Sequence, residues 1–164
     1  MKLKMEKIKW TFSIVIAVVI IIAGVSGYFL TFSPSTEEEN SRSYAVLGEP
    51  APDFTVMSLD GEKVSLSDFR GNIVVLDFMA TSCLQCKLEM EHLRQIHSKY
   101  SGEGVVLISV DIDYSESLDQ IRRFKEAFGG QWLFTLDVNA QTGIRYQIPI
   151  LPTVYIIDQD GGGI

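Results

Sequence analysis

The chain has 164 residues, 46% of them hydrophobic and 21% charged, which is enough for one globular domain with its own core. Its formal net charge is −7 at pH 7, and it contains only two cysteines. The acidic balance argues against nucleic-acid binding, and two cysteines exclude a small scaffold built on several disulfides.

The N-terminal part is expected to anchor the chain in a membrane. The first nine residues carry four lysines and one glutamate, whereas the chain after residue 31 carries 10 Lys and Arg against 20 Asp and Glu. Residues 10–31 contain no charged side chain, and a helix of that length spans roughly 32 Å, close to the thickness of a bilayer core. The lysines predict that residues 1–9 form a basic cytoplasmic tail, that residues 10–31 are a transmembrane anchor, and that the following domain lies outside the cytoplasm.

A cleaved signal peptide is the alternative for this segment, with Val25-Ser26-Gly27 as the cleavage site. Its apolar stretch is longer than that of most signal peptides, which favours the anchor. Both interpretations export the rest of the chain. Residues 32–47 are polar, acidic and without periodicity, so they are expected to be a flexible linker.

From residue 48 the pattern alternates between strands and helices, which predicts an α/β domain. Strands are expected at residues 55–59, 63–66, 73–79, 105–110, 132–136 and 153–157. Helices or helical turns are expected at residues 66–69, 83–100, 117–128 and 140–146. In the helix 83–100, the apolar residues at helical spacing are Leu84, Leu88, Leu93, Ile96 and Tyr100. Asp60-Gly61 predicts a hairpin turn between the first two strands.

The two cysteines, Cys83 and Cys86, are spaced C-x-x-C where a buried strand leads into a helix. A helix N-terminus favours the thiolate, so Cys83 is the candidate nucleophile and Cys86 the thiol that closes the disulfide. A zinc site and a static structural disulfide are the alternatives. The histidines at positions 92 and 97 do not complete a plausible zinc site with the cysteines. We therefore predict thiol–disulfide exchange, without a metal or other cofactor.

Two carboxylates lie near the dithiol in the sequence. Asp77 interrupts the apolar strand six residues before Cys83, where burial would raise its pKa and let it accept the proton of Cys86. The alternative is a solvated Asp at the strand end. Glu89, one turn past Cys86, could tune the dithiol through its charge or could simply be a solvated helix residue.

These residues together resemble the thioredoxin superfamily. The strand residues Asp77-Phe78 precede the C-x-x-C pair, and Leu151-Pro152-Thr153 precedes a late strand. Within the superfamily the chain is similar to the membrane-anchored, TlpA-like thiol–disulfide oxidoreductases related to peroxiredoxins. The matching segments of that branch are Ala51-Pro52-Asp53-Phe54, Asp60-Gly61, residues 64–68, Gly71, residues 156–158 and Asp160-Gly161.

The resemblance implies a thioredoxin-like α/β fold with an N-terminal β-hairpin extension, preceded by the single transmembrane helix. Residues 48–164 would form this domain without the family's last strand and helix. Cys83 would be the exposed nucleophile, Cys86 the buried resolving thiol and Pro152 a cis-proline whose neighbours Leu151 and Thr153 bind substrate. The expected partners are protein thiols and disulfides and a membrane electron donor of the CcdA or DsbD type. Apocytochrome c is one substrate of the family, and no residue of this sequence selects it.

The chain also departs from the family at several positions. Ser82 and Met79 stand where Trp is frequent, Leu84-Gln85 replaces a common x-Pro, and the branch often has Asn at the position of Asp77. Two other functions stay open at this point: a redox-silent thioredoxin-like binding or assembly module, and a thiol peroxidase. Against the peroxidase, Thr81 lies two residues before Cys83 instead of three.

Overall fold

The computed structural model describes residues 44–162. The predicted cytoplasmic tail, the anchor at residues 10–31 and most of the linker lie outside the described residues. No helix within residues 44–162 is both long and apolar enough to cross a membrane.

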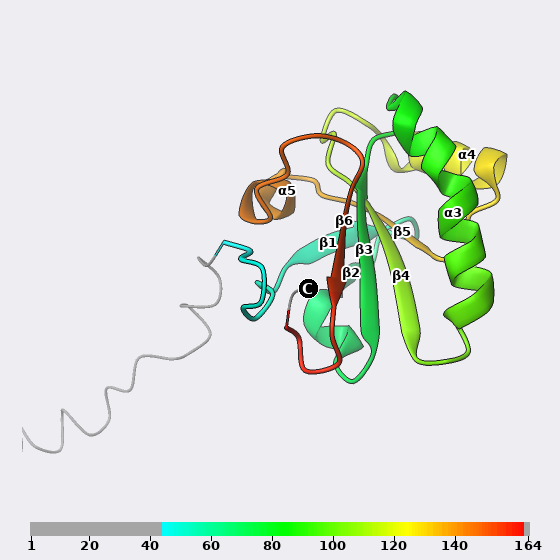
Figure 1. Ribbon diagram of the computed structural model, residues 1–164. Coiled ribbons are helices and arrows are strands. Elements are labelled where there is room, and N and C mark those ends of the chain that lie inside the picture. The colour runs from blue at the N-terminus through cyan, green and yellow to red at the C-terminus, as the bar shows by residue number, and fades with distance from the viewer. Residues whose placement is uncertain (1–43, 163–164) are drawn as a thin grey trace, which may run out of the picture. The chain divides into compact units, whose positions relative to one another are not determined.

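Within residues 44–162, six strands and four helical segments follow one another in the order shown in Figure 1. The strands are β1 (Thr55–Ser58), β2 (Lys63–Ser65), β3 (Ile73–Met79), β4 (Val105–Asp111), β5 (Leu133–Leu136) and β6 (Thr153–Ile157). The helices are the 3-10 helix η1 (Leu66–Phe69), α3 (Leu84–Tyr100), α4 (Leu118–Phe128) and α5 (Gln141–Arg145).

The strands form one mixed sheet in the order β2-β1-β5-β4-β3-β6. β3, β4 and β5 are parallel, so their carboxyl ends meet at one edge of the sheet. β6 runs antiparallel to β3, and the β1–β2 hairpin runs antiparallel to β5. This is a thioredoxin-like arrangement with an added N-terminal hairpin. The predicted turn at Asp60-Gly61 is present, with Gly61 at a φ of 82° that favours glycine.

Each face of the sheet buries its own apolar cluster. On one face, α3 and α4 cover Val75, Met79, Leu107 and Phe134 together with the helix residues Met90, Leu93, Ile121 and Phe124. On the other face, Leu76, Phe78, Ile108 and Val110 pack with Leu66, Tyr146 and Phe54. In Figure 1, α5 lies on the opposite side of the sheet from α3 and α4. Both faces of β3 and β4 are covered, which explains why these strands have continuous apolar sequences. The same sequences predicted them as buried strands.

The periodicity expected for α3 is partly wrong. Leu84 and Leu88 are 67% and 62% exposed, whereas the buried residues of the helix are Cys86, Met90 and Leu93. The helix therefore presents the face that carries Cys86 to the sheet. Its two N-terminal leucines remain at the surface beside the dithiol.

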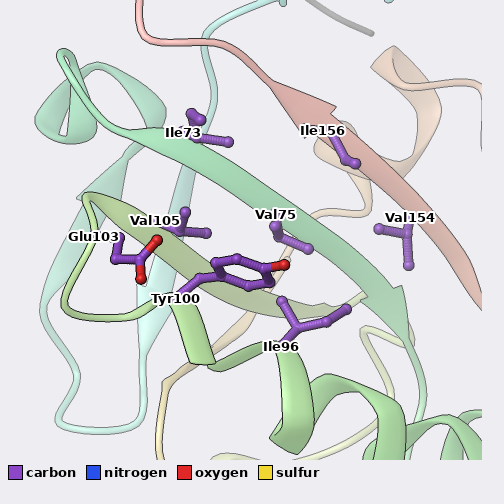
Figure 2. Close-up of a pocket in the computed structure, with 8 residues that line it drawn as sticks. All are labelled: Ile73, Val75, Ile96, Tyr100, Glu103, Val105, Val154 and Ile156. Carbon is purple, nitrogen blue, oxygen red and sulfur yellow. The ribbon is translucent and has the colours of Figure 1, made fainter. Parts of the chain in front are cut away.

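An apolar groove of about 460 Å³ lies between the C-terminal half of α3 and strands β3, β4 and β6 (Figure 2). Its lining residues are Ile73, Val75, Ile96, Tyr100, Glu103, Val105, Val154 and Ile156. Ile73 begins β3 and Tyr100 ends α3, whereas the dithiol follows the end of β3 and begins α3. The groove is thus at the opposite end of α3 from the dithiol.

Candidate active site

The dithiol lies at the carboxyl end of the parallel strands. β3 ends at Met79, a tight turn brings the Cys83 N–H within 3.1 Å of the Ala80 carbonyl oxygen, and α3 begins at Leu84. Cys83 and Cys86 form a disulfide, and their Cα atoms are 5.3 Å apart. The C-x-x-C spacing places both sulfurs at the first turn of one helix, as the sequence predicts.

The two cysteines differ in exposure. Cys86 is only 3% exposed and belongs to the core beneath α3, whereas Cys83 is partly exposed at the N-cap position. The Cys83 sulfur accepts a hydrogen bond from the Cys86 N–H at 3.1 Å, and the first turn of α3 carries no acidic side chain. The free N–H groups and the dipole of the helix therefore favour a thiolate at Cys83.

Asp77 is a buried carboxyl in the middle of β3, with 2% of its surface exposed. It shares the strand face of Val75 and Met79, which is the face that α3 and Cys86 cover. Ser109 Oγ donates a hydrogen bond to Asp77 Oδ2 at 2.7 Å, and Trp132 Nε1 donates to Ser109 Oγ at 2.9 Å. Burial raises the pKa of Asp77 to about 7; the Ser109 hydrogen bond opposes this increase and the charge of Glu89 adds to it.

Glu89 is half-buried on α3, and its Oε2 atom is buried without a hydrogen-bond partner among the described residues. Burial raises the pKa of the Glu89 carboxyl, while the charge of His92 opposes the increase. The charge of Glu89, on α3, also contributes to the raised pKa of Asp77. The structure thus brings Glu89 and Asp77 together on the side of the sheet that carries the dithiol.

The segment Leu151-Pro152-Thr153 enters β6, and the Leu151–Pro152 peptide bond is cis. Thr153 Oγ1 donates to the Ile150 carbonyl oxygen at 2.7 Å. Neither the N–H nor the carbonyl of Leu151 makes a hydrogen bond within residues 44–162. Leu151 and Cys83 pack against the same apolar cluster, so this free backbone lies on the dithiol side of the molecule.

Three further residues support the site, and no sequence pattern predicts their roles. Ser109 and Trp132 hold Asp77 from β4 and from the residue before β5. The Glu116 carboxylate accepts hydrogen bonds from the N–H groups of Thr81 and Ser82, just before Cys83. Each contact joins residues more than 20 positions apart, and only the pairing of the strands and loops reveals it.

No group of three or more His, Cys, Asp or Glu side chains within residues 44–162 is arranged to hold a metal ion. A dithiol at a helix N-terminus, in one apolar cluster with the residue before a cis-proline and on the sheet face that carries a buried acid, is typical of a thioredoxin-like thiol–disulfide exchange site.

Comparisons with known proteins agree with this class. Residues 47–162 match the AhpC/TSA family. The thiol-disulfide oxidoreductase ResA of Bacillus thuringiensis subsp. konkukian is 31% identical over 96% of this chain and 86% of its own length. ResA of Geobacillus kaustophilus is 30% identical over 88% of this chain and 80% of its own length.

Solved structures show the same relationship. The thioredoxin domain of a thiol-disulfide oxidoreductase from Bacteroides vulgatus superposes with a TM-score of 0.67 at 25% identity, over 73% of this chain and 86% of that domain. The chain belongs to the AhpC/TSA family and is a thiol–disulfide oxidoreductase similar to the ResA proteins.

Replacing Asp77 by Asn should stabilise the oxidised protein, and more so at higher pH. The unfolded Asp loses its proton near its ordinary pKa of 3.8, whereas the native one keeps it until about pH 7. Stability therefore falls between these two values as pH rises, and Asn removes that loss. We expect a gain in unfolding free energy on the order of 2–4 kcal/mol at about pH 7.5 and almost none at about pH 4, measured by urea unfolding.

The exposed Asp160, changed to Asn, is the matched control and should show no such pH-dependent gain. A gain for Asp77→Asn that is equal at both pH values would contradict a raised pKa at this carboxyl.

Proposed function

We propose that this protein is a membrane-anchored enzyme that exchanges disulfides with protein substrates outside the cytoplasm. The observation that carries the proposal is the unequal exposure of the two cysteines, with Cys83 accessible at the start of α3 and Cys86 buried beneath it. In a static disulfide neither this difference in exposure nor a nearby titratable acid would have a function. In thiol–disulfide exchange, the nucleophile must be accessible to substrate and the resolving thiol must lose its proton to an acceptor.

In the reducing direction, the Cys83 thiolate attacks one sulfur of a substrate disulfide and displaces the other as a thiolate. This forms a mixed disulfide between Cys83 and the substrate. The Cys86 thiol then transfers its proton to Asp77 and attacks the Cys83 sulfur, which releases the substrate's second thiolate. Two electrons pass to the substrate, and the enzyme ends with its Cys83–Cys86 disulfide closed. The oxidising direction is the reverse of these steps.

The substrate backbone binds beside Pro152 in this proposal. The free N–H and carbonyl of Leu151 can pair with an extended substrate segment, as a strand is added to an existing edge. The exposed Leu84 and Leu88 offer apolar contact close to the attacking sulfur. Main-chain pairing places few requirements on the side chains of the substrate. This suits an enzyme that acts on several protein thiols.

The location rests on the sequence. The lysines of residues 1–9 and the uncharged stretch at 10–31 support an anchor with a cytoplasmic N-terminus. Sustained reduction of substrates outside the cytoplasm needs electrons from across the membrane. A donor of the CcdA or DsbD type would supply them, and apocytochrome c is the first substrate to test.

The Cys86→Ser variant should trap substrates as mixed disulfides with Cys83, because the resolving thiol is absent. We expect disulfide-linked adducts in non-reducing gels that disappear with reductant, and at least about tenfold fewer with Cys83→Ser. Equal trapping by both variants would contradict the assigned roles.

Turnover assays separate the remaining functions. The full-length protein should reduce insulin with dithiothreitol as donor, and the Cys83→Ser variant should not. A protein without dithiol-dependent activity would be a binding or assembly module. Rapid consumption of hydrogen peroxide, with little insulin reduction, would instead indicate a thiol peroxidase.

The proposed location has its own test. Intact cells expressing the full chain are treated with a mild reductant and then with a membrane-impermeant maleimide. Cys83 should be labelled without lysis, because it is the accessible thiol and the domain is outside. Labelling that needs lysis would place the domain in the cytoplasm, and a cytoplasmic protein with one cysteine serves as the control for leakage.

A further inference from the structure

A second pair of acids, Asp111 and Glu116, lies against the loop that leads to the dithiol. Neither takes part in the exchange steps proposed for Cys83, Cys86 and Asp77. Glu116 follows β4 and is 8% exposed. Its two carboxylate oxygens accept separate hydrogen bonds, Oε2 from the Thr81 N–H at 3.2 Å and Oε1 from the Ser82 N–H at 3.3 Å. Both amides belong to the short connection between β3 and Cys83. A side chain about 34 residues away in sequence thus holds the backbone that leads to the nucleophile.

The loop that carries Glu116 is itself folded tightly. Asp111 Oδ1 accepts the Asp113 N–H at 2.9 Å, and Asp113 Oδ1 accepts both the N–H and the hydroxyl of Ser115. The Glu116 N–H then donates to the Asp113 carbonyl oxygen at 2.9 Å. These successive turns reverse the chain directly after β4. They direct Glu116 back toward the end of β3.

Asp111 is the last residue of β4, where this loop begins, and none of its surface is exposed. Its Oδ2 atom is buried without a hydrogen-bond donor among the described residues. Besides the Asp113 N–H on Oδ1, the carboxyl of Glu116 lies within hydrogen-bonding reach of the Asp111 carboxyl. Two ionised carboxylates cannot satisfy each other, whereas one proton between them makes a strong hydrogen bond. The orphan oxygen is therefore explained if Asp111 carries a proton and donates it to Glu116.

We propose that Glu116, supported by the carboxyl of Asp111, is a positioning residue that fixes the Thr81–Ser82 backbone and so the orientation of Cys83. The proposal rests on the dithiol exchange described above and adds the device that holds the nucleophile in place. With the proton on Asp111, both oxygens of Glu116 remain acceptors for the Thr81 and Ser82 N–H groups. An ionised carboxylate accepts backbone N–H groups more strongly than a neutral one.

This device depends on pH. The charged groups facing Asp111 are Glu116 and Asp113, both acidic, and the Asp137 carboxylate nearby is occupied by the N–H groups of Thr142 and Gly143. Burial, and then the contact with Glu116, raises the pKa of Asp111 to about 8. Above that pH Asp111 has lost the proton that it donates to Glu116, and its negative charge then faces the Glu116 carboxyl. The hold on the loop therefore weakens as pH rises through about 8 and is intact below it.

Proton–nitrogen NMR of the full chain in detergent tests the contact directly and needs no enzyme activity. The amide resonances of Thr81 and Ser82 should shift together with a midpoint near pH 8, as the Asp111 proton is lost. Asp111→Asn keeps a donor toward Glu116 at every pH and should abolish this shift. If both resonances titrate identically in wild type and Asp111→Asn, the proposal is overturned.

Single-turnover reduction of a peptide disulfide between about pH 6 and 9.5 tests the consequence. Wild type should lose rate above about pH 8, and Asp111→Asn should keep its rate there. Glu116→Gln places an amide NH₂ or a neutral oxygen against the two N–H groups and should lower the rate about tenfold at pH 7.

The matched control is Glu103→Gln, the same chemical change at an exposed residue before the opposite end of β4. It should leave both the rate and the pH profile unchanged. A rate for Glu116→Gln within about twofold of wild type, or a high-pH loss that persists in Asp111→Asn, would overturn the positioning role. An inactive wild type would count against the proposed function, while the NMR titration would still decide the Asp111–Glu116 contact.

Discussion

A carboxyl group buried in the centre of the sheet is the constraint on which the site depends. Within β3 Asp77 is flanked by the apolar Leu76 and Phe78, and it is tolerated because Ser109 of β4 donates a hydrogen bond to it and Trp132, just before β5, donates one to Ser109. The register of β3 against β4 places Ser109 directly opposite Asp77. The arrangement of the central strands and the protonation of this acid are therefore linked.

The dithiol is poised between opposing electrostatic effects. The N-terminus of α3 favours a thiolate at Cys83, and buried carboxyls lie on both sides of the loop. Near neutral pH Asp111 holds its proton, which limits the negative charge near the sulfur. The raised pKa of Asp77 near 7 gives this acid both protonation states under working conditions, as proton transfer requires.

Sequence patterns predicted most of the fold because the strands and helices are locally consistent. β3 and β6 begin and end at the predicted residues, and α3, α4 and the β1–β2 hairpin follow within one or two. The C-x-x-C pair, Asp77 and Glu89 were predicted as site residues from residue patterns, and the 151–153 segment was predicted from the family resemblance. The buried face of α3 was not predicted correctly. The N-terminus of this helix, which carries the dithiol, is partly exposed, and Leu84 and Leu88 therefore remain at the surface. Ser109, Trp132 and Glu116 could not be found either, since ordinary residues acquire their roles through contacts across distant strands and loops.

The central claim is that the Asp77 carboxyl exchanges its proton near neutral pH. Carbon NMR of the full chain, labelled at the aspartate side-chain carbons and assigned with Asp77→Asn, measures this titration directly. The account predicts a midpoint near pH 7 for Asp77 in the folded protein. A midpoint below about pH 5, close to that of an ordinary aspartate, would contradict it and remove Asp77 as the proton acceptor of Cys86.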